Sequence, residues 1–302
     1  MTSGTAFHGR KLSYRQILEI LLIFESGAKG RSLLDVSRLV GCTPKTAQVN
    51  FGKIREMLVQ QMDLSPLQGT IHMDAVYLGG KPRKTNHRKR KLPPDALKVR
   101  FGRKPPDNPN EPWVSAGMTR KNWEKRLNKR AAISLCEAGD PGTGSHRTVA
   151  FVCAAEDDAS VMTLATHLIG NGSIVMTDEC AAYTRMSSLH EHYTVRHSRE
   201  WVTYEGVNNN MSETWNSRVR RYEYGVGHGF RPKYVQDYVC EFSWRESMRR
   251  RSQKERTHDL LTRLLRSPPS AWWRGYWQGR HRSGEIGLSY FLDRLAKCQG
   301  VS

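Results

Sequence analysis

The sequence has few cysteines, no long apolar segment and comparatively few acidic residues. Its six cysteines are scattered singly, without the spacing of a zinc knuckle, so we expect free and mostly buried thiols and no structural zinc site. No run of about 18 apolar residues and no signal-peptide pattern occurs, which argues against a membrane protein. The low acidic content leaves 48 Lys and Arg against 29 Asp and Glu, a net charge of +19.

This positive charge predicts a polyanionic partner, most simply nucleic acid. An anionic membrane surface is the competing partner, and the lack of an apolar segment makes it the weaker choice. We therefore expect the protein to work where DNA is. In a bacterium that is the cytoplasm, in association with the nucleoid; in a eukaryote it is the nucleus.

Three short helices with clear capping residues are predicted near the start of the chain. Residues 14–26 carry apolar side chains at helical spacing. Ser32 can cap a second helix that ends at Val40, and Thr43 can cap a third that begins with Pro44. The tight turn between the second and third helices is typical of a helix-turn-helix DNA-binding module.

The third helix of this module is the one predicted to read DNA. Its residues near the N-terminal end, Lys45, Thr46 and Gln48, could reach base edges, while Lys53 and Arg55 are better placed for phosphates. Gly52 in the middle of the helix weakens the prediction slightly. The alternative is an ordinary three-helix module used for dimerisation.

Three carboxylates stand in distinctive surroundings. Asp74 (in GTIHMDAVYLGGK) and Asp178 (in GSIVMTDECAAY) lie on short β-prone runs flanked by glycine, so we place both on strands. Glu213 follows Asp178 by 35 residues on a predicted helix. Arg220 shares its helical face two turns later. A weak surface pair is the plain alternative for Glu213 and Arg220.

Two strand aspartates and a helix glutamate at this spacing are the layout of the DDE transposases and integrases. From about Leu67 to Arg245 the chain resembles the transposase domain of one bacterial insertion-sequence branch, in which the third acid sits in a phrase His-Thr-Asn-x-x-Glu with Lys seven residues later. The corresponding positions here are Asn208, Asn209, Asn210, Glu213 and Arg220. Two features depart from that branch: Ala75 stands where a second acid is usual, and no zinc ribbon precedes the core.

The order of predicted elements agrees with the resemblance and indicates an α/β fold. It is a ribonuclease-H-like mixed sheet with flanking helices, preceded by the small all-α helix-turn-helix module. We divide the chain into residues 1–62 (DNA-binding module), 63–248 (catalytic domain with a basic loop at 81–112) and 249–302 (basic and aromatic helical tail). In the loop, Lys81, Arg83 and Lys84 are expected to hold DNA phosphates. The Trp- and Arg-rich segment 271–280 could stack on DNA or anchor the core, with equal weight.

The resemblance implies that Asp74, Asp178 and Glu213 together hold two Mg²⁺ or Mn²⁺ ions for phosphoryl transfer on DNA. Three carboxylates so close together cannot all stay ionised without cost, so one should have a raised pKa until metal binds. Asn210 and Arg220 are expected to contact the metal-binding acids or a substrate phosphate. Turn chemistry before the helix is an equal explanation for Asn208 and Asn209. His72 shares the strand face of Asp74, and we favour a packed histidine there over a metal ligand.

The sequence thus predicts a transposase that binds the terminal inverted repeats of its own mobile element, and cuts and joins double-stranded DNA. Element ends and target DNA are the expected partners. A homo-oligomer on DNA, at least a dimer, is also expected. Two alternatives remain open: a domesticated DNA-binding protein without cutting activity, and a structure-selective nuclease of the same fold.

Overall fold

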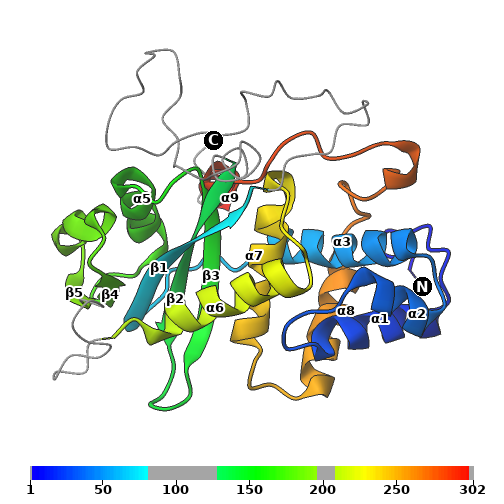
Figure 1. The fold of residues 1–302 in the computed structure, drawn as a ribbon, viewed down its shortest axis with the longest axis horizontal. Helices are drawn as coiled ribbons and strands as arrows, with labels where there is room; N and C mark the ends of the chain where they lie inside the picture. Colours follow the sequence, from blue (N-terminus) through cyan, green and yellow to red (C-terminus); the bar gives the residue numbers. More distant parts are fainter. Residues whose placement is uncertain (1, 81–127, 196–207, 299–302) are drawn as a thin grey trace, which may run out of the picture.

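The computed structural model describes residues 2–80, 128–195 and 208–298 (Figure 1). The basic segment 81–112, with Lys81, Arg83 and Lys84, lies outside the described residues. The helices are α1 (Tyr14–Ser26), α2 (Leu33–Val40), α3 (Pro44–Gln60), α5 (Asp158–Leu168), α6 (Asn210–Gly225), α7 (Val235–Ser247), α8 (Gln253–Arg266) and α9 (Leu288–Cys298), with 3-10 helices η2 (Ala181–Ser188), η3 (Pro232–Tyr234) and η4 (Tyr276–Gln278). The strands are β1 (Thr70–Gly79), β2 (Lys129–Ala138), β3 (Ser145–Cys153), β4 (Ile174–Asp178) and β5 (Glu191–Val195).

The strands form one mixed sheet in the order β3-β2-β1-β4-β5. The first three strands in sequence make an antiparallel meander, while β4 runs parallel to β1 and β5 parallel to β4. This topology and the helices between the strands confirm the predicted ribonuclease-H-like arrangement. The 3-10 helix η2 follows Asp178 and connects β4 to β5.

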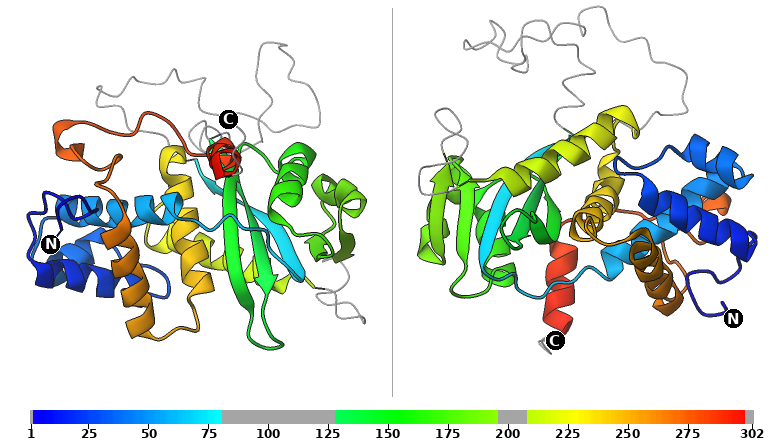
Figure 2. Two further views of the ribbon diagram at one scale, coloured as in Figure 1. Left: turned by 180° about the vertical axis from the view of Figure 1, so that it is seen from behind. Right: turned by 90° about the horizontal axis from the view of Figure 1, so that it is seen from below.

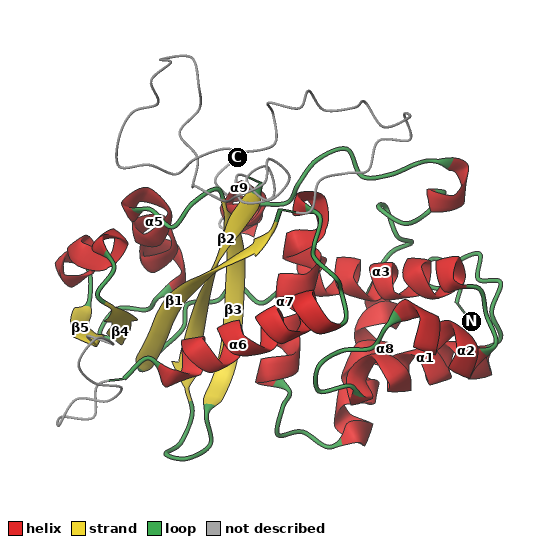
Figure 3. Cartoon of the chain, in the orientation of Figure 1, coloured by secondary structure: helices red, strands yellow, loops and turns green. Residues whose placement is uncertain are grey.

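Different helices cover the two faces of the sheet, and the two core clusters show which helix lies over Asp74. Met73 of β1 belongs to a core cluster that includes Phe291 of α9. Val76 belongs to a second cluster, which includes Trp215 of α6. Since side chains alternate along a strand, Asp74 lies on the face that α6 covers. Figure 3 shows α6 crossing in front of the sheet.

The three N-terminal helices have the predicted bounds, and each has a capping side chain. The hydroxyls of Ser13, Ser32 and Thr43 accept hydrogen bonds from backbone N–H groups in the first turns of α1, α2 and α3. Gly41, with φ 67°, ends α2 in the left-handed region and allows the tight turn. Helix α3 packs against α7 and α8, and α1 packs against α8, so residues far apart in the chain share one core (Figure 2). The domain boundaries at 62 and 248 stay a prediction.

Arg55 is not available to bind phosphate, contrary to the sequence interpretation. Its side chain is 6% exposed, and its Nε donates a 2.7 Å hydrogen bond to Glu241 Oε2 of α7. Arg245 pairs with the same carboxylate at 2.8 Å. The pattern of charged residues on α3 did not reveal this buried ion pair, because its partner lies 186 residues away.

The described cysteines are free thiols, as expected. Cys136, Cys153 and Cys240 are buried, whereas Cys42 and Cys180 are partly exposed. Among the helices that the structure describes, none combines the length and the apolar character needed to cross a bilayer.

Candidate active site

Asp74 sits in the middle of the central strand, β1, with both carboxylate oxygens engaged. Its Oδ1 accepts the backbone N–H of Ala75 at 2.7 Å, and its Oδ2 accepts Nδ2 of Asn216, on α6, at 2.7 Å. The side chain is half-buried. These two bonds hold the carboxylate beneath α6.

Asp178 ends β4, the strand that lies beside β1. The parallel register pairs His72 with Met176, and continuing it by two residues brings Asp178 level with Asp74 on the same face. The Oδ1 atom of Asp178 accepts the backbone N–H of Cys180 at 3.0 Å, which fixes the turn after the strand.

The start of α6 is fastened to β1 by side chains at positions 209, 212 and 216, which share one helical face. Each donates a hydrogen bond to the strand: Asn209 Nδ2 to the Met73 carbonyl (3.1 Å), Ser212 Oγ to the His72 carbonyl (2.7 Å) and Asn216 Nδ2 to Asp74 Oδ2 (2.7 Å). Glu213, half-buried, lies on the same helix between Ser212 and Asn216. The helix therefore carries Glu213 to the acidic face of the sheet.

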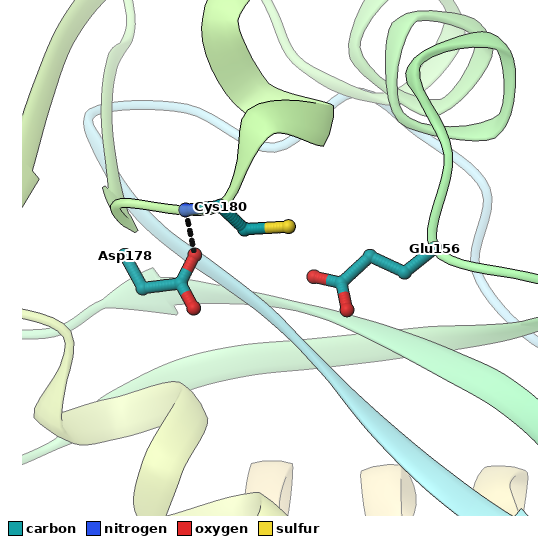
Figure 4. A group of neighbouring side chains, drawn as sticks. All are labelled: Glu156, Asp178 and Cys180. Atoms are coloured by element: carbon teal, nitrogen blue, oxygen red, sulfur yellow. Dashed lines mark hydrogen bonds between the residues drawn. The ribbon is translucent and has the colours of Figure 1, made fainter. Parts of the chain in front are cut away.

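A fourth acid, Glu156, joins this group from the connection between β3 and α5. Its carboxylate points toward Asp178 and Cys180 (Figure 4), and ligand atoms of these three residues lie within 4.8 Å of one another. The hydroxyl of Tyr183, on η2, donates a 2.9 Å hydrogen bond to Glu156 Oε1. Glu156 was not predicted from the sequence, because the pattern in this region indicates only the start of a helix.

Burial and neighbouring acids raise the pKa values of Asp74 and Glu156. Burial, followed by the negative charge of Asp178 and then those of Glu156 and Glu213, raises the pKa of Asp74 to about 7, while the Ala75 amide opposes the shift. Burial also raises the pKa of Glu156, and the Tyr183 hydroxyl opposes that rise. The shift at Asp74 agrees with the expectation that one acid of the group should be hard to ionise.

The donor set fits a hard divalent cation. Asp74, Asp178 and Glu156 have no Lys or Arg partner in the described part of the chain, so no described cation offsets their charge. Carboxylate oxygens are the ligands that Mg²⁺ and Mn²⁺ prefer. Burial raises the pKa of the Cys180 thiol, which therefore stays protonated at neutral pH and is a poor metal ligand.

The other predicted site residues of α6 are exposed. Asn210 donates its backbone N–H to Asn208 Oδ1 at 3.2 Å, a turn contact, and Arg220 lies two turns beyond Glu213 with its side chain exposed. Asn209 instead contacts β1 and is fully buried. His72 is buried, and burial lowers its pKa to about 4, so the imidazole is neutral. Roles for Asn210 and Arg220 in substrate binding stay predictions.

The predicted DNA-reading residues of α3 are brought together with a distant segment. Lys45 is exposed, and its Nζ lies 5.0 Å from the centre of the Trp277 ring. Gln48 Nε2 donates a 3.1 Å hydrogen bond to the Tyr276 hydroxyl. Thr46 Oγ1 is 2.9 Å from Thr43 Oγ1 at the cap of the helix. The tail segment thus lies against the predicted reading helix.

Comparison with protein families matches residues 110–247 to the ISXO2-like transposase domain. This part of the chain is a DDE transposase domain. The matched range contains Asp178, Glu213, Glu156 and Asn216, whereas Asp74 precedes it. The transposase domain implies a transposase, a phosphoryl-transfer enzyme that binds DNA, and such enzymes generally use divalent metal ions. No curated protein matches the chain.

Asn216 had a signal in the sequence, whereas Glu156 had none that distinguishes it from a helix cap. Asn216 follows Glu213 by three residues, and this spacing places both on neighbouring positions of one helix face. Glu156 precedes Asp157, whose side chain caps α5 by accepting the Ser160 N–H at 2.8 Å. In the sequence, an acid next to a helix cap is indistinguishable from a capping residue. Only the fold shows that Glu156 lies beside Asp178.

Proposed function

We propose that the protein is an active transposase that cleaves the ends of its own mobile element and joins them to target DNA. The observation that carries this proposal is the meeting of Asp74, Asp178, Glu156 and Glu213 at the sheet, with the pKa of Asp74 raised to about 7. Such a group of acids is unfavourable unless a cation offsets its charge. The domain match supports DNA as the substrate.

In this proposal Asp74, Asp178 and Glu213 are the metal ligands, and Glu156 adds a fourth carboxylate beside Asp178. Two bound Mg²⁺ or Mn²⁺ ions would supply Lewis-acid activation of the attacking oxygen and stabilise the leaving one. Asn216 orients the Asp74 carboxylate through its 2.7 Å hydrogen bond. Tyr183 does the same for Glu156 through its 2.9 Å hydrogen bond.

The α1–α3 module is proposed to recognise the terminal inverted repeats. Its capped helices and tight turn have helix-turn-helix form, and Lys45 is exposed near the N-terminal end of α3. The net charge of +19 supports binding to the phosphate backbone. We further propose that two or more copies assemble on DNA, because a transposase must bring two element ends together.

The test is to incubate the full protein with element ends, a target plasmid and Mg²⁺, and to look for joined products. Asp74→Asn, Asp178→Asn and Glu213→Gln should each abolish cutting and joining and retain binding to the ends. Glu179→Gln, at an exposed acid next to Asp178, is the matched control and should stay active. Cutting without joining would favour the nuclease alternative, and specific binding without cutting would favour the domesticated DNA-binding protein.

A further inference from the structure

The segment between α8 and α9 lies lengthwise along one face of α3. Four positions of α3 at helical spacing contact it in turn, at 56, 52, 48 and 45. Glu56 accepts hydrogen bonds from the Ser270 hydroxyl and from the backbone N–H groups of Ala271 (2.7 Å) and Trp272 (3.1 Å). The segment, orange in Figures 1 and 2, passes α3 in each view.

The next contacts continue along the helix toward its N-terminal end. The Trp273 indole packs so closely on Gly52 that a Cβ atom there would overlap the ring, which explains a glycine in mid-helix. Gln48 then bonds to Tyr276, and Lys45 lies by Trp277. Residues 270–277, the aromatic strap, are therefore part of the DNA-reading module.

The strap limits how α3 can meet a duplex. An α-helix with its side chains is about 10–12 Å across, and the major groove of B-DNA is about 12 Å wide. A helix with a second chain segment along its side cannot lie lengthwise in that groove. Its exposed N-terminal end, from Thr43 to Lys45, remains free to enter.

A groove of about 410 Å³ runs beside the strap. Its floor is a second face of α3, with Thr46, Asn50 and Lys53. One wall is the strap, and the other is the N-terminal segment from His8 to Leu12. Three stretches of chain that are distant in sequence thus form one site.

The lining of the groove has the chemistry of a nucleotide site. It holds four cations, Arg10, Lys11, Lys53 and Arg274, and no carboxylate among the described residues. Trp277, 53% exposed, supplies aromatic surface. The indole Nε1 of Trp273, a residue only 6% exposed, is a buried donor with no acceptor in the described structure.

We propose that this groove binds an unpaired nucleotide of a DNA strand, with the base against the indole of Trp277 and its phosphates near Arg274 and Lys11. Aromatic side chains interleaved with cations are how proteins hold single strands, since every base has a stacking face. The volume lies in the range of small-molecule pockets, about 300–1,000 Å³, which excludes a duplex. The proposal rests on DNA as the partner, and not on the metal site.

The test is binding of the full protein to a fluorescein-labelled oligothymidylate and to a blunt duplex, in EDTA, by fluorescence anisotropy. Trp277→Ala should weaken binding of the oligothymidylate about 5- to 100-fold. Arg274→Ala should weaken it and reduce the salt dependence by about one phosphate contact. Trp277 is 53% exposed, so the substitution should leave the thermal unfolding temperature unchanged.

Two matched controls lie outside the groove. Tyr224, 61% exposed near the end of α6, and Arg266, exposed at the end of α8, can each be replaced by Ala. Both controls should bind the oligothymidylate like the wild type. Equal affinity of Trp277→Ala and wild type for it would overturn the proposal. So would an equal loss of affinity for the blunt duplex. Because EDTA prevents cleavage, an inactive metal site would leave these measurements unaffected.

Discussion

Replacing Asp74 by Asn should stabilise the metal-free protein at high pH, although it removes a proposed metal ligand. The pKa of Asp74 is raised from 3.8 to about 7 in the folded chain. Between these values the folded protein keeps a proton that the unfolded chain has released, so stability falls as pH rises through this window. The shift corresponds to at most about 4 kcal/mol, and solvent contact of the half-buried group reduces our expectation to about 2 kcal/mol.

The substitution preserves the hydrogen bonds around position 74. The Ala75 N–H and Asn216 Nδ2 both donate to Asp74 carboxylate oxygens at 2.7 Å. The buried Oδ1 of Asn216 has no donor in the described structure, so after rotation of one amide an Asn at position 74 can donate to it. The difference in stability between wild type and Asp74→Asn therefore reports the effect of the carboxylate charge at position 74.

The measurement is urea unfolding in EDTA at pH 5 and pH 8, followed by circular dichroism. Because this window covers only the part of the shift above pH 5, wild type should lose about 1 kcal/mol relative to Asp74→Asn between these pH values. Mg²⁺ at pH 8 should restore stability to the wild type far more than to the variant. Glu179→Gln, at the exposed neighbouring acid, should follow the wild type. A difference between wild type and Asp74→Asn that does not change with pH would refute a raised pKa at Asp74.

Three further substitutions test other parts of the site and fold. Glu156→Gln should weaken Mn²⁺ binding by about 10- to 100-fold in calorimetry, whereas Glu179→Gln should not; equal affinities would exclude Glu156 from the metal site. Arg220→Ala should slow single-turnover cleavage of a pre-bound end about 10²–10³-fold and Arg220→Lys much less, and equal rates would remove Arg220 from the site. Arg55→Met should cost about 3 kcal/mol in urea unfolding because it leaves Glu241 with one cation fewer; a loss under about 1 kcal/mol would contradict that role.

The parts of the fold that depend on local chemistry could be predicted from the sequence. Thr43 followed by Pro44 determines the start of α3, because capping and proline geometry involve only adjacent residues. The strands bearing Asp74 and Asp178 were visible for a similar reason, since β-branched and apolar residues between glycines favour extended chain. Together with the family resemblance, these local signals predicted the sheet and its α/β class.

The features that the sequence did not reveal depend on contacts between distant segments. Gln48 and Tyr276 are 228 residues apart, and Arg55 and Glu241 are 186 apart. An arginine on a basic helix looks the same in sequence whether it faces solvent or a buried acid. Only the packing of α3 on α7 shows that Arg55 belongs to the core and Lys45 to the surface.

Helix α3 links the two proposed functions physically. Its N-terminal end carries the residues that we propose read DNA, of which Lys45 is exposed. Its C-terminal half is held in the core by the Arg55–Glu241 ion pair. Arg55 also donates to the hydroxyl of Tyr222, on α6, at 3.4 Å, and α6 carries Glu213. Separating Arg55 from Glu241 would leave the buried guanidinium of Arg55 without its carboxylate partner, so α3 is held firmly against α7. In the proposed complex, DNA bound at the N-terminal end of α3 would therefore lie at a fixed position relative to the acids on the sheet.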